Sequence, residues 1–149
     1  AWMIEALEPS PDDRVLEVGT GSGYGAAVLA HIVRTVYTVE RHRDLAEAAA
    51  RRLAELGYTN VHVRHGDGTL GWPEEAPFDG IVVTASGPQI PRALREQLAV
   101  GGRLVIPVGQ TPNSQELVRL HRVTETETRR ENLGSVRFVP LVGKGGWNG

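Results

Sequence analysis

Residues 15–25 have the sequence VLEVGTGSGYG, in which a short apolar run leads directly into four glycines, one at every second position. A short apolar run bounded by turn residues is typical of a buried strand. Glycine permits a sharp turn, and it lets the backbone approach a ligand closely because no Cβ is in the way. We therefore predict a strand that ends at Val18 and a turn that passes a bound small molecule before the next helix.

The rest of the chain alternates short β-rich runs with helical patterns, which is typical of βαβ units around a parallel sheet. After Gly109 this alternation stops, and two further runs favour antiparallel strands joined by the polar segment 124–132. The expected fold class is α/β: a Rossmann-like, mostly parallel, doubly wound sheet with antiparallel C-terminal strands. The predicted strands are 14–19, 35–40, 61–65, 80–85, 102–109, 116–123 and 136–142; the predicted helical segments are 26–33, 45–57 and 91–102, the second ending at Gly57.

Length and composition narrow the functional class. A chain of 149 residues fits one domain, here residues 1–149, and its net charge of −2 argues against a nucleic-acid partner, since such binding needs clustered Lys and Arg. No apolar stretch approaches the roughly 18 residues of a membrane span, so we expect no membrane partner. The chain contains no cysteine, which is compatible with a reducing compartment, and we expect a cytoplasmic monomer.

The N-terminal residues AWMIEALEPSP form the second half of a helical pattern, with no N-cap residue before it and Ala1 in place of an initiating Met. No signal-peptide pattern is present either. We therefore expect the chain to be an N-terminally truncated domain of a longer protein.

The ligand at the glycine turn can be narrowed by charge. Gly21, Gly23 and Ala26 fit the G-x-G-x-x-A variant of a dinucleotide motif, which would place a pyrophosphate at the turn. Glu17, two residues before Gly19, disfavours a pyrophosphate and favours a cationic ligand. S-adenosylmethionine (AdoMet), with its sulfonium and amino groups, fits that requirement. A turn that only packs a helix on a strand remains the alternative.

Two further acids follow later strands. Glu40 ends the second strand, 21 residues after Gly19, where a doubly wound fold places an acid on a nucleotide ribose. Asp67 lies in a Gly-flanked turn after the third strand, where it could accept a hydrogen bond from the adenine amino group. The alternatives are a solvated acid at position 40 and a plain turn aspartate at position 67.

The segments VLEVGTGSGY, GDGTLGWPEEAPFDGIVVTAS, LREQLAVGGRLVIPVG and FVPLVGKGGW resemble the protein-L-isoaspartate O-methyltransferase family over nearly the whole chain. The resemblance implies an AdoMet-dependent class I methyltransferase that methylates the free carboxylate of L-isoaspartyl residues in damaged proteins, leading to their repair. Family members carry a Thr-Ile-Ser type motif upstream of the helix that AWMIEAL resembles, and its hydroxyl serves the active site. That motif would lie upstream of Ala1, so no catalytic residue is predicted within this chain. The predicted cofactor residues are Glu17, Gly19, Gly21, Ser22, Gly23, Glu40, Asp67 and Gly68, and the predicted substrate residues are Phe138, Val139, Pro140, Leu141 and Val142.

Other chemistries fit less well. The Asn/Asp-Pro-Pro-Tyr motif of amino methyltransferases is replaced by VTASGP after the fourth strand, and there is no cysteine for cytosine methylation. The five histidines are scattered, so no metal site is predicted. A peptide carboxylate is ionised at neutral pH and needs no general base, which fits the lack of an acid–base pair. A methyltransferase for aspartate in peptide natural products, a non-catalytic nucleotide-binding module and an NAD-dependent oxidoreductase remain alternatives.

Overall fold

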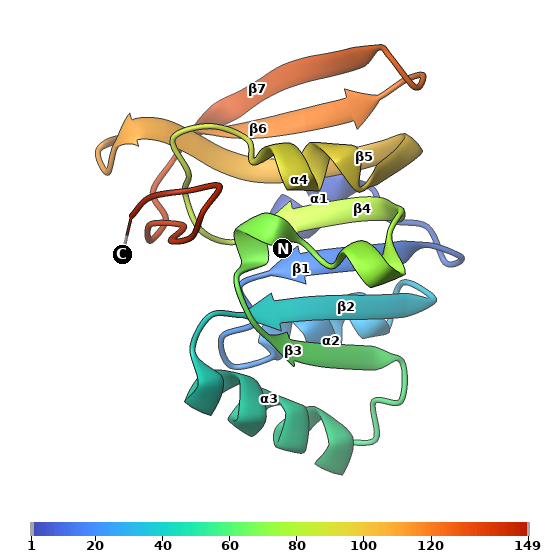
Figure 1. Ribbon diagram of the computed structural model, residues 1–149. Helices are drawn as coiled ribbons and strands as arrows, with labels where there is room; N and C mark the ends of the chain where they lie inside the picture. Colours follow the sequence, from blue (N-terminus) through green and yellow to red (C-terminus); the bar gives the residue numbers. More distant parts are fainter. Residues whose placement is uncertain (1, 149) are drawn as a thin grey trace.

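The computed structural model describes residues 2–148, which form one seven-stranded sheet covered by helices on both faces (Figure 1). The strand order is β3-β2-β1-β4-β5-β6-β7; the first five strands are parallel, and β6 and β7 are antiparallel additions. This is the Rossmann-like α/β fold expected from the sequence. The strands are β1 Arg14–Val18, β2 Thr35–Glu40, β3 Val61–His65, β4 Phe78–Val83, β5 Leu98–Thr111, β6 Ser114–Arg122 and β7 Thr128–Val136.

Two ends of the predicted domain lie outside the described residues. The domain was expected to span residues 1–149, and both Ala1 and Gly149 fall outside the range 2–148. The expectation that a catalytic motif lies upstream of Ala1 likewise concerns residues beyond this range, so it stays a prediction.

The four α-helices of the described residues divide between the two faces of the sheet. Helices α1, α2 and α3 contribute to one hydrophobic cluster, and α4 contributes to the other (Figure 1). Two short 3-10 helices, η1 and η2, occupy the connection between β3 and β4, where no α-helix forms. The helices are α1 Trp2–Leu7, α2 Tyr24–Ala30, α3 Arg43–Glu55, α4 Arg92–Glu96, η1 Gly68–Leu70 and η2 Pro73–Glu75.

The end of α3 follows the prediction. Gly57 has φ of 85°, and the Gly57 N–H donates to the Ala54 carbonyl while the Tyr58 N–H donates to the Leu53 carbonyl. This pair of bonds is the Schellman motif, which needs a left-handed residue just after the helix. Glycine meets that requirement without strain.

The C-terminal strand differs from the prediction. The second antiparallel strand is β7, Thr128–Val136, which lies largely within the segment predicted as a polar connection. The segment 136–142, predicted as that strand, is not part of the sheet beyond Val136; it runs beside the loop after β4 instead. β7 is the last strand of the sheet and is mostly exposed, so it needs no apolar face, whereas Pro140 cannot donate a hydrogen bond to a strand ladder.

Smaller differences concern boundaries. Strand β4 starts at Phe78 and ends at Val83, about two residues earlier than predicted, and β5 begins at Leu98, inside the segment predicted as helix and exit turn. Phe78 and Leu98 are paired and fully buried, which explains why both begin strands. The helix there, α4, is therefore short.

Candidate functional site

A cavity of about 280 Å³ lies where the parallel strands reach their carboxyl ends, the place where doubly wound sheets bind ligands. We call it the strand-end cavity. It brings together residues of the glycine turn, the end of β2, the turn after β3 and the C-terminal segment. Among the residues predicted from the sequence it contains Gly19, Gly21, Glu40, Gly68, Val139, Pro140, Leu141 and Val142.

Glycine is required for a different reason at each position of the turn. Gly19, Gly21 and Gly23 all have positive φ, at 102°, 53° and 93°. A Cβ on Gly19 would collide with the Thr84 hydroxyl, and a Cβ on Gly23 would press on Leu53 of α3 at 3.4 Å. Only Gly21 of the three faces open space, with no protein atom within 4 Å of an added Cβ. Gly21 is therefore the position where the turn itself leaves room for a ligand.

Glu40 is held rigidly at the edge of the strand-end cavity. Its side chain is buried, its Oε1 accepts the Gly21 N–H at 2.9 Å, and its Oε2 accepts the His42 N–H at 2.9 Å. The alternative of a solvated acid is therefore wrong. Each carboxylate oxygen keeps free acceptor capacity, so Glu40 can both fix the turn and accept hydrogen bonds from a ligand.

Glu17 lies outside the strand-end cavity, on the face of the sheet covered by α2. Its Oε1 accepts a 2.7 Å hydrogen bond from the Thr38 hydroxyl, which lies 2.6 Å from the Thr20 hydroxyl in the turn. Burial raises the pKa of the Glu17 carboxyl to about 7, against the lowering effect of the Thr38 bond. The carboxyl also lines a neighbouring groove with Trp2 and Tyr24. In the structure Glu17 is linked to the glycine turn through the hydroxyls of Thr38 and Thr20. Direct contact between Glu17 and the cofactor stays a prediction.

Asp67 begins the short helix η1 and already has partners within the protein. Its Oδ1 accepts from the Thr69 backbone N–H and hydroxyl at 2.9 and 2.6 Å, and its Oδ2 accepts the Lys144 N–H at 3.0 Å. Partial burial acts to raise the pKa of Asp67, but these bonds outweigh it and hold the pKa below its usual value. The contacts match the turn-aspartate alternative. Asp67 lines a small pocket that adjoins the strand-end cavity through Arg41 and Val142.

Ser22 and Gly23 of the turn do not line the strand-end cavity. Ser22 is exposed: its Oγ accepts the Tyr24 N–H at 3.4 Å, and its carbonyl accepts a bond from Arg52. Cofactor contacts at Ser22 and Gly23 stay predictions.

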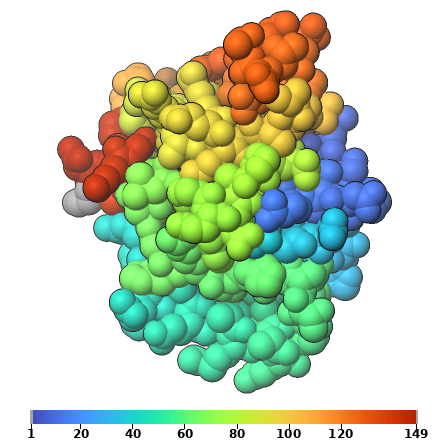
Figure 2. Space-filling model, turned by 45° about the vertical axis from the view of Figure 1, so that its right-hand side comes forward, coloured from blue at the N-terminus to red at the C-terminus, as the bar shows by residue number. Residues whose placement is uncertain are grey.

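The predicted substrate segment, 138–142, is extended but pairs with a loop rather than a strand. The Ser86 N–H donates to the Val139 carbonyl at 2.7 Å, and the Leu141 N–H donates to the Ser86 carbonyl at 2.8 Å. In Figure 2 the C-terminal residues, drawn in red, lie at one side of the molecular surface. Phe138, the first residue of the segment, lines other pockets than the strand-end cavity.

Sequence reasoning missed several residues of the strand-end cavity. Each of the polar ones follows a parallel strand directly, which is the signal that could have found them: Arg41 and His42 come after β2, and Thr84 comes after β4. The remaining lining residues are Val18, Val39, Leu45 and Ala85.

Within residues 2–148, no group of three or more His, Cys, Asp or Glu side chains could hold a metal ion. None of the described helices combines the length and the apolar character that crossing a membrane requires.

Comparison with known proteins gives a consistent result. A family model described as protein-L-isoaspartate(D-aspartate) O-methyltransferase matches residues 1–146. Protein-L-isoaspartate O-methyltransferase 1 of Geotalea uraniireducens is 64% identical over 147 residues, which are 99% of this chain and 67% of the relative. Protein-L-isoaspartate O-methyltransferase 2 of Pelobacter propionicus is 62% identical over 99% of this chain and 65% of its own length. The chain thus spans about two thirds of the curated relatives it matches.

Solved structures agree with the sequence comparisons. A protein-L-isoaspartate O-methyltransferase superposes with a TM-score of 0.88 at 30% identity, over 97% of this chain and 47% of that one. A Plasmodium falciparum protein described as a beta-aspartate methyltransferase, solved in complex with S-adenosyl-L-homocysteine, superposes with a TM-score of 0.71 at 25% identity, over 95% of this chain and 70% of that one.

Proposed function

The chain belongs to the protein-L-isoaspartate(D-aspartate) O-methyltransferase family, a family of AdoMet-dependent enzymes, and we propose that its strand-end cavity binds AdoMet for methylation of L-isoaspartyl residues. The observation that carries this proposal is the meeting of two segments far apart in sequence. The turn residues Gly19 and Gly21 and the acid Glu40 line the same cavity as Val139–Val142, which the resemblance assigns to the substrate.

The cavity suits AdoMet chemically. Glu40 offers a buried, backbone-held carboxylate to the ribose hydroxyls, and Gly21 leaves the turn open beside it. Val18, Val39 and Leu141 supply apolar surface for the nucleoside. An acid that ends the second strand of a doubly wound sheet binds the ribose of NAD as well as that of AdoMet, so Glu40 supports a nucleoside ligand without choosing the cofactor. Membership of the family favours AdoMet over NAD.

When bound, AdoMet supplies an electrophilic methyl on a sulfonium whose departure leaves a neutral thioether. The isoaspartyl carboxylate is already ionised at neutral pH, so the chain need not remove a proton. The work left to its residues is to orient the peptide and exclude water, and holding two reactants in line can contribute about 7–11 kcal/mol. Residues Val139–Val142 line the cavity beside Ser86 and would form its peptide side.

We also propose that the whole protein acts on isoaspartyl proteins or peptides in the cytoplasm as a monomer. The cysteine-free sequence is compatible with a reducing compartment. A methyltransferase for aspartate in peptide natural products is the second candidate, because its catalytic core would have the same form.

The cofactor is tested by calorimetry with AdoMet and with NAD. We expect AdoMet binding and no NAD binding. Gly21→Asn should fold, because Asn tolerates left-handed φ and Gly21 has no protein atom within 4 Å, yet its side chain should obstruct the ligand. Unchanged AdoMet affinity in the folded variant would remove the turn from the site.

The reaction is tested with labelled AdoMet, an isoaspartyl peptide and its aspartyl twin. Two proteins are compared: the 149-residue chain, and a chimera that adds, before Ala1 and after Gly149, the unmatched parts of the 64% identical relative. We expect methyl transfer to the isoaspartyl peptide alone, and greater turnover in the chimera. Transfer to the aspartyl twin would favour the second candidate, and no transfer by either protein would contradict the proposal.

A further inference from the structure

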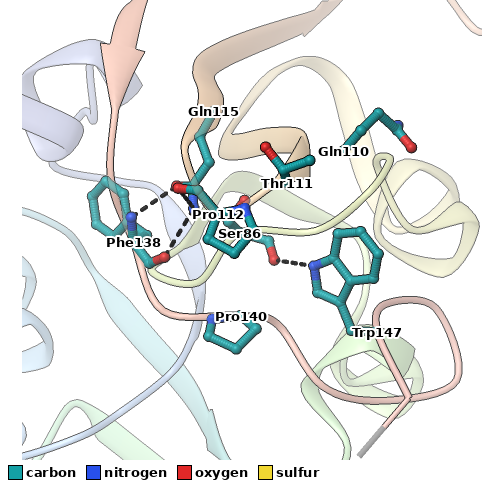
Figure 3. A pocket seen from close by; sticks show the side chains of 8 residues that line it. All are labelled: Ser86, Gln110, Thr111, Pro112, Gln115, Phe138, Pro140 and Trp147. Atoms are coloured by element: carbon teal, nitrogen blue, oxygen red, sulfur yellow. Dashed lines mark hydrogen bonds between the residues drawn. The ribbon is translucent and has the colours of Figure 1, made fainter.

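A second cavity, of about 230 Å³, lies between the tip of the β5–β6 hairpin and the C-terminal segment (Figure 3). It shares only Pro140 with the strand-end cavity. Two prolines, a phenylalanine and an indole form much of its wall. Its lining residues are Ser86, Gln110, Thr111, Pro112, Gln115, Phe138, Pro140 and Trp147.

Several polar groups of the wall are already engaged inside the protein. The Gln115 carboxamide, which is buried, accepts the Phe138 N–H at 2.7 Å and donates to the Phe138 carbonyl at 3.0 Å (Figure 3). The Trp147 indole N–H donates to the Ser86 carbonyl at 3.0 Å. A water in a cavity needs two to four polar partners, whereas these bonds leave mainly apolar surface. The second cavity therefore favours an apolar occupant.

These same bonds also make the cavity preformed. Gln115 fixes the backbone of Phe138 to β6, and Ser86 fixes both Trp147 and the segment 138–142 to the loop after β4. A rigid apolar pocket binds without a cost for ordering its walls. A cavity of about 150 Å³ accommodates benzene, so the second cavity has room for a branched aliphatic or aromatic side chain.

The second cavity adjoins the strand-end cavity across one residue. Pro140 lines both, and Val139, whose side chain is 69% exposed, lies next to it in the strand-end cavity. An extended peptide advances about 3.3 Å per residue. A peptide with its isoaspartyl carboxylate in the strand-end cavity can thus reach past Pro140 with a side chain one or two residues away.

We infer that the second cavity is a subsite for an apolar side chain of the substrate peptide, within two residues of the isoaspartyl residue. The inference rests on the proposed function. It assigns Pro112, Phe138, Pro140 and Trp147 to peptide selection, and it predicts that damaged sites next to Leu or Phe are methylated in preference to those next to Ala.

The test uses hexapeptides with one isoaspartyl residue and either Ala or Leu at each of the two positions before and after it. Methyl transfer is measured with labelled AdoMet, in whichever of the two proteins described above has the greater turnover. We expect Leu to lower KM about tenfold at one of the four positions, the discrimination that a few methylenes give in an apolar pocket, with kcat little changed. Equal KM values for Ala and Leu at all four positions would overturn the inference.

Two matched variants locate the effect. Thr111→Trp, at the hairpin tip, should fill the second cavity and raise the KM of the Leu peptide to that of the Ala peptide. Asn113→Trp adds the same side chain to the same hairpin but does not line the cavity, so it should keep the preference. If Thr111→Trp does not fold, Gln110→Trp replaces it at the rim. A preference that survives a filled cavity contradicts the inference.

The experiment distinguishes a failure of this inference from a failure of the proposed function. If the Ala-flanked isoaspartyl peptide is methylated but Leu gives no advantage, the function stands and the subsite does not. If no isoaspartyl peptide is methylated, the function itself fails and the subsite falls with it.

Discussion

Replacing Glu17 by Gln should change how stability depends on pH. Glu17 is 3% exposed and lies beneath the glycine turn, and burial raises the pKa of its carboxyl from 4.5 to about 7. The unfolded chain keeps the lower value. Between pH 4.5 and about pH 7 the folded state therefore binds a proton that the unfolded state has lost, so the free energy of unfolding falls as pH rises through this range.

The size of the effect follows from the same two values. At about 1.4 kcal/mol for each pH unit, the interval from 4.5 to about 7 corresponds to about 3 kcal/mol of unfolding free energy. The loss is complete above pH 7, where the buried carboxyl is charged. The carboxamide introduced by Glu17→Gln would stay neutral, and its carbonyl oxygen can still accept the Thr38 hydroxyl that now donates at 2.7 Å. The variant should thus escape this loss.

The assay is urea unfolding without cofactor at pH 5, 6, 7 and 8, for the unaltered chain and for Glu17→Gln. We expect the variant to gain on the unaltered chain by about 2.5 kcal/mol between pH 5 and pH 8. Glu47→Gln, on the exposed face of α3, serves as the control and should follow the unaltered chain. Parallel pH profiles for the Glu17 variant and the unaltered chain would refute the reasoning, because they would show that burial does not hold a proton on Glu17.

Three further predictions concern the site, a helix end and the core. Glu40→Ala should weaken AdoMet binding by about 1.5–3 kcal/mol, the range for hydrogen bonds to charged groups; a calorimetric change below about 0.5 kcal/mol would leave Glu40 only its role in the turn. Gly57→Ala should cost about 1–2 kcal/mol in urea unfolding because φ is 85° there; no loss would contradict the cap. Phe78→Ala, fully buried, should cost about 3–5 kcal/mol, against about 0.5 or less for Leu56→Ala, 66% exposed; similar costs would contradict the assigned core.

The parallel half of the sheet could be predicted because its strands are buried on both faces. Such strands need continuous apolar runs, and TVYTVE and the run in VLEV stand out for that reason. The antiparallel half could not be predicted as well. The edge strand β7 is mostly exposed, so its residues TRRENLGSV lack an apolar pattern, while the apolar residues after it pack against Ser86 outside the sheet.

The candidate site was predictable where strand ends determine it. Glu40 and Gly68 lie at or just after the ends of their strands, and parallel strands bring their carboxyl ends to one edge. The sequence did not predict on which face of the sheet the Glu17 side chain lies. Side chains alternate between the two faces along β1, and the sequence does not say which face α2 covers. The bonds of Asp67 to Lys144 and of Gln115 to Phe138 join residues 77 and 23 positions apart, and no local pattern predicts them.

The carboxylate of the strand-end cavity also agrees with the proposed chemistry. Its lining includes one carboxylate, Glu40, and both oxygens of that group already accept backbone N–H bonds. Both oxygens of this carboxylate are thus engaged in fixing the turn. A hydroxyl or amine substrate needs a base that accepts a proton, whereas a peptide carboxylate does not. Glu40 is therefore poorly suited to act as that base, which agrees with a nucleophile that arrives ionised, as in carboxyl methylation.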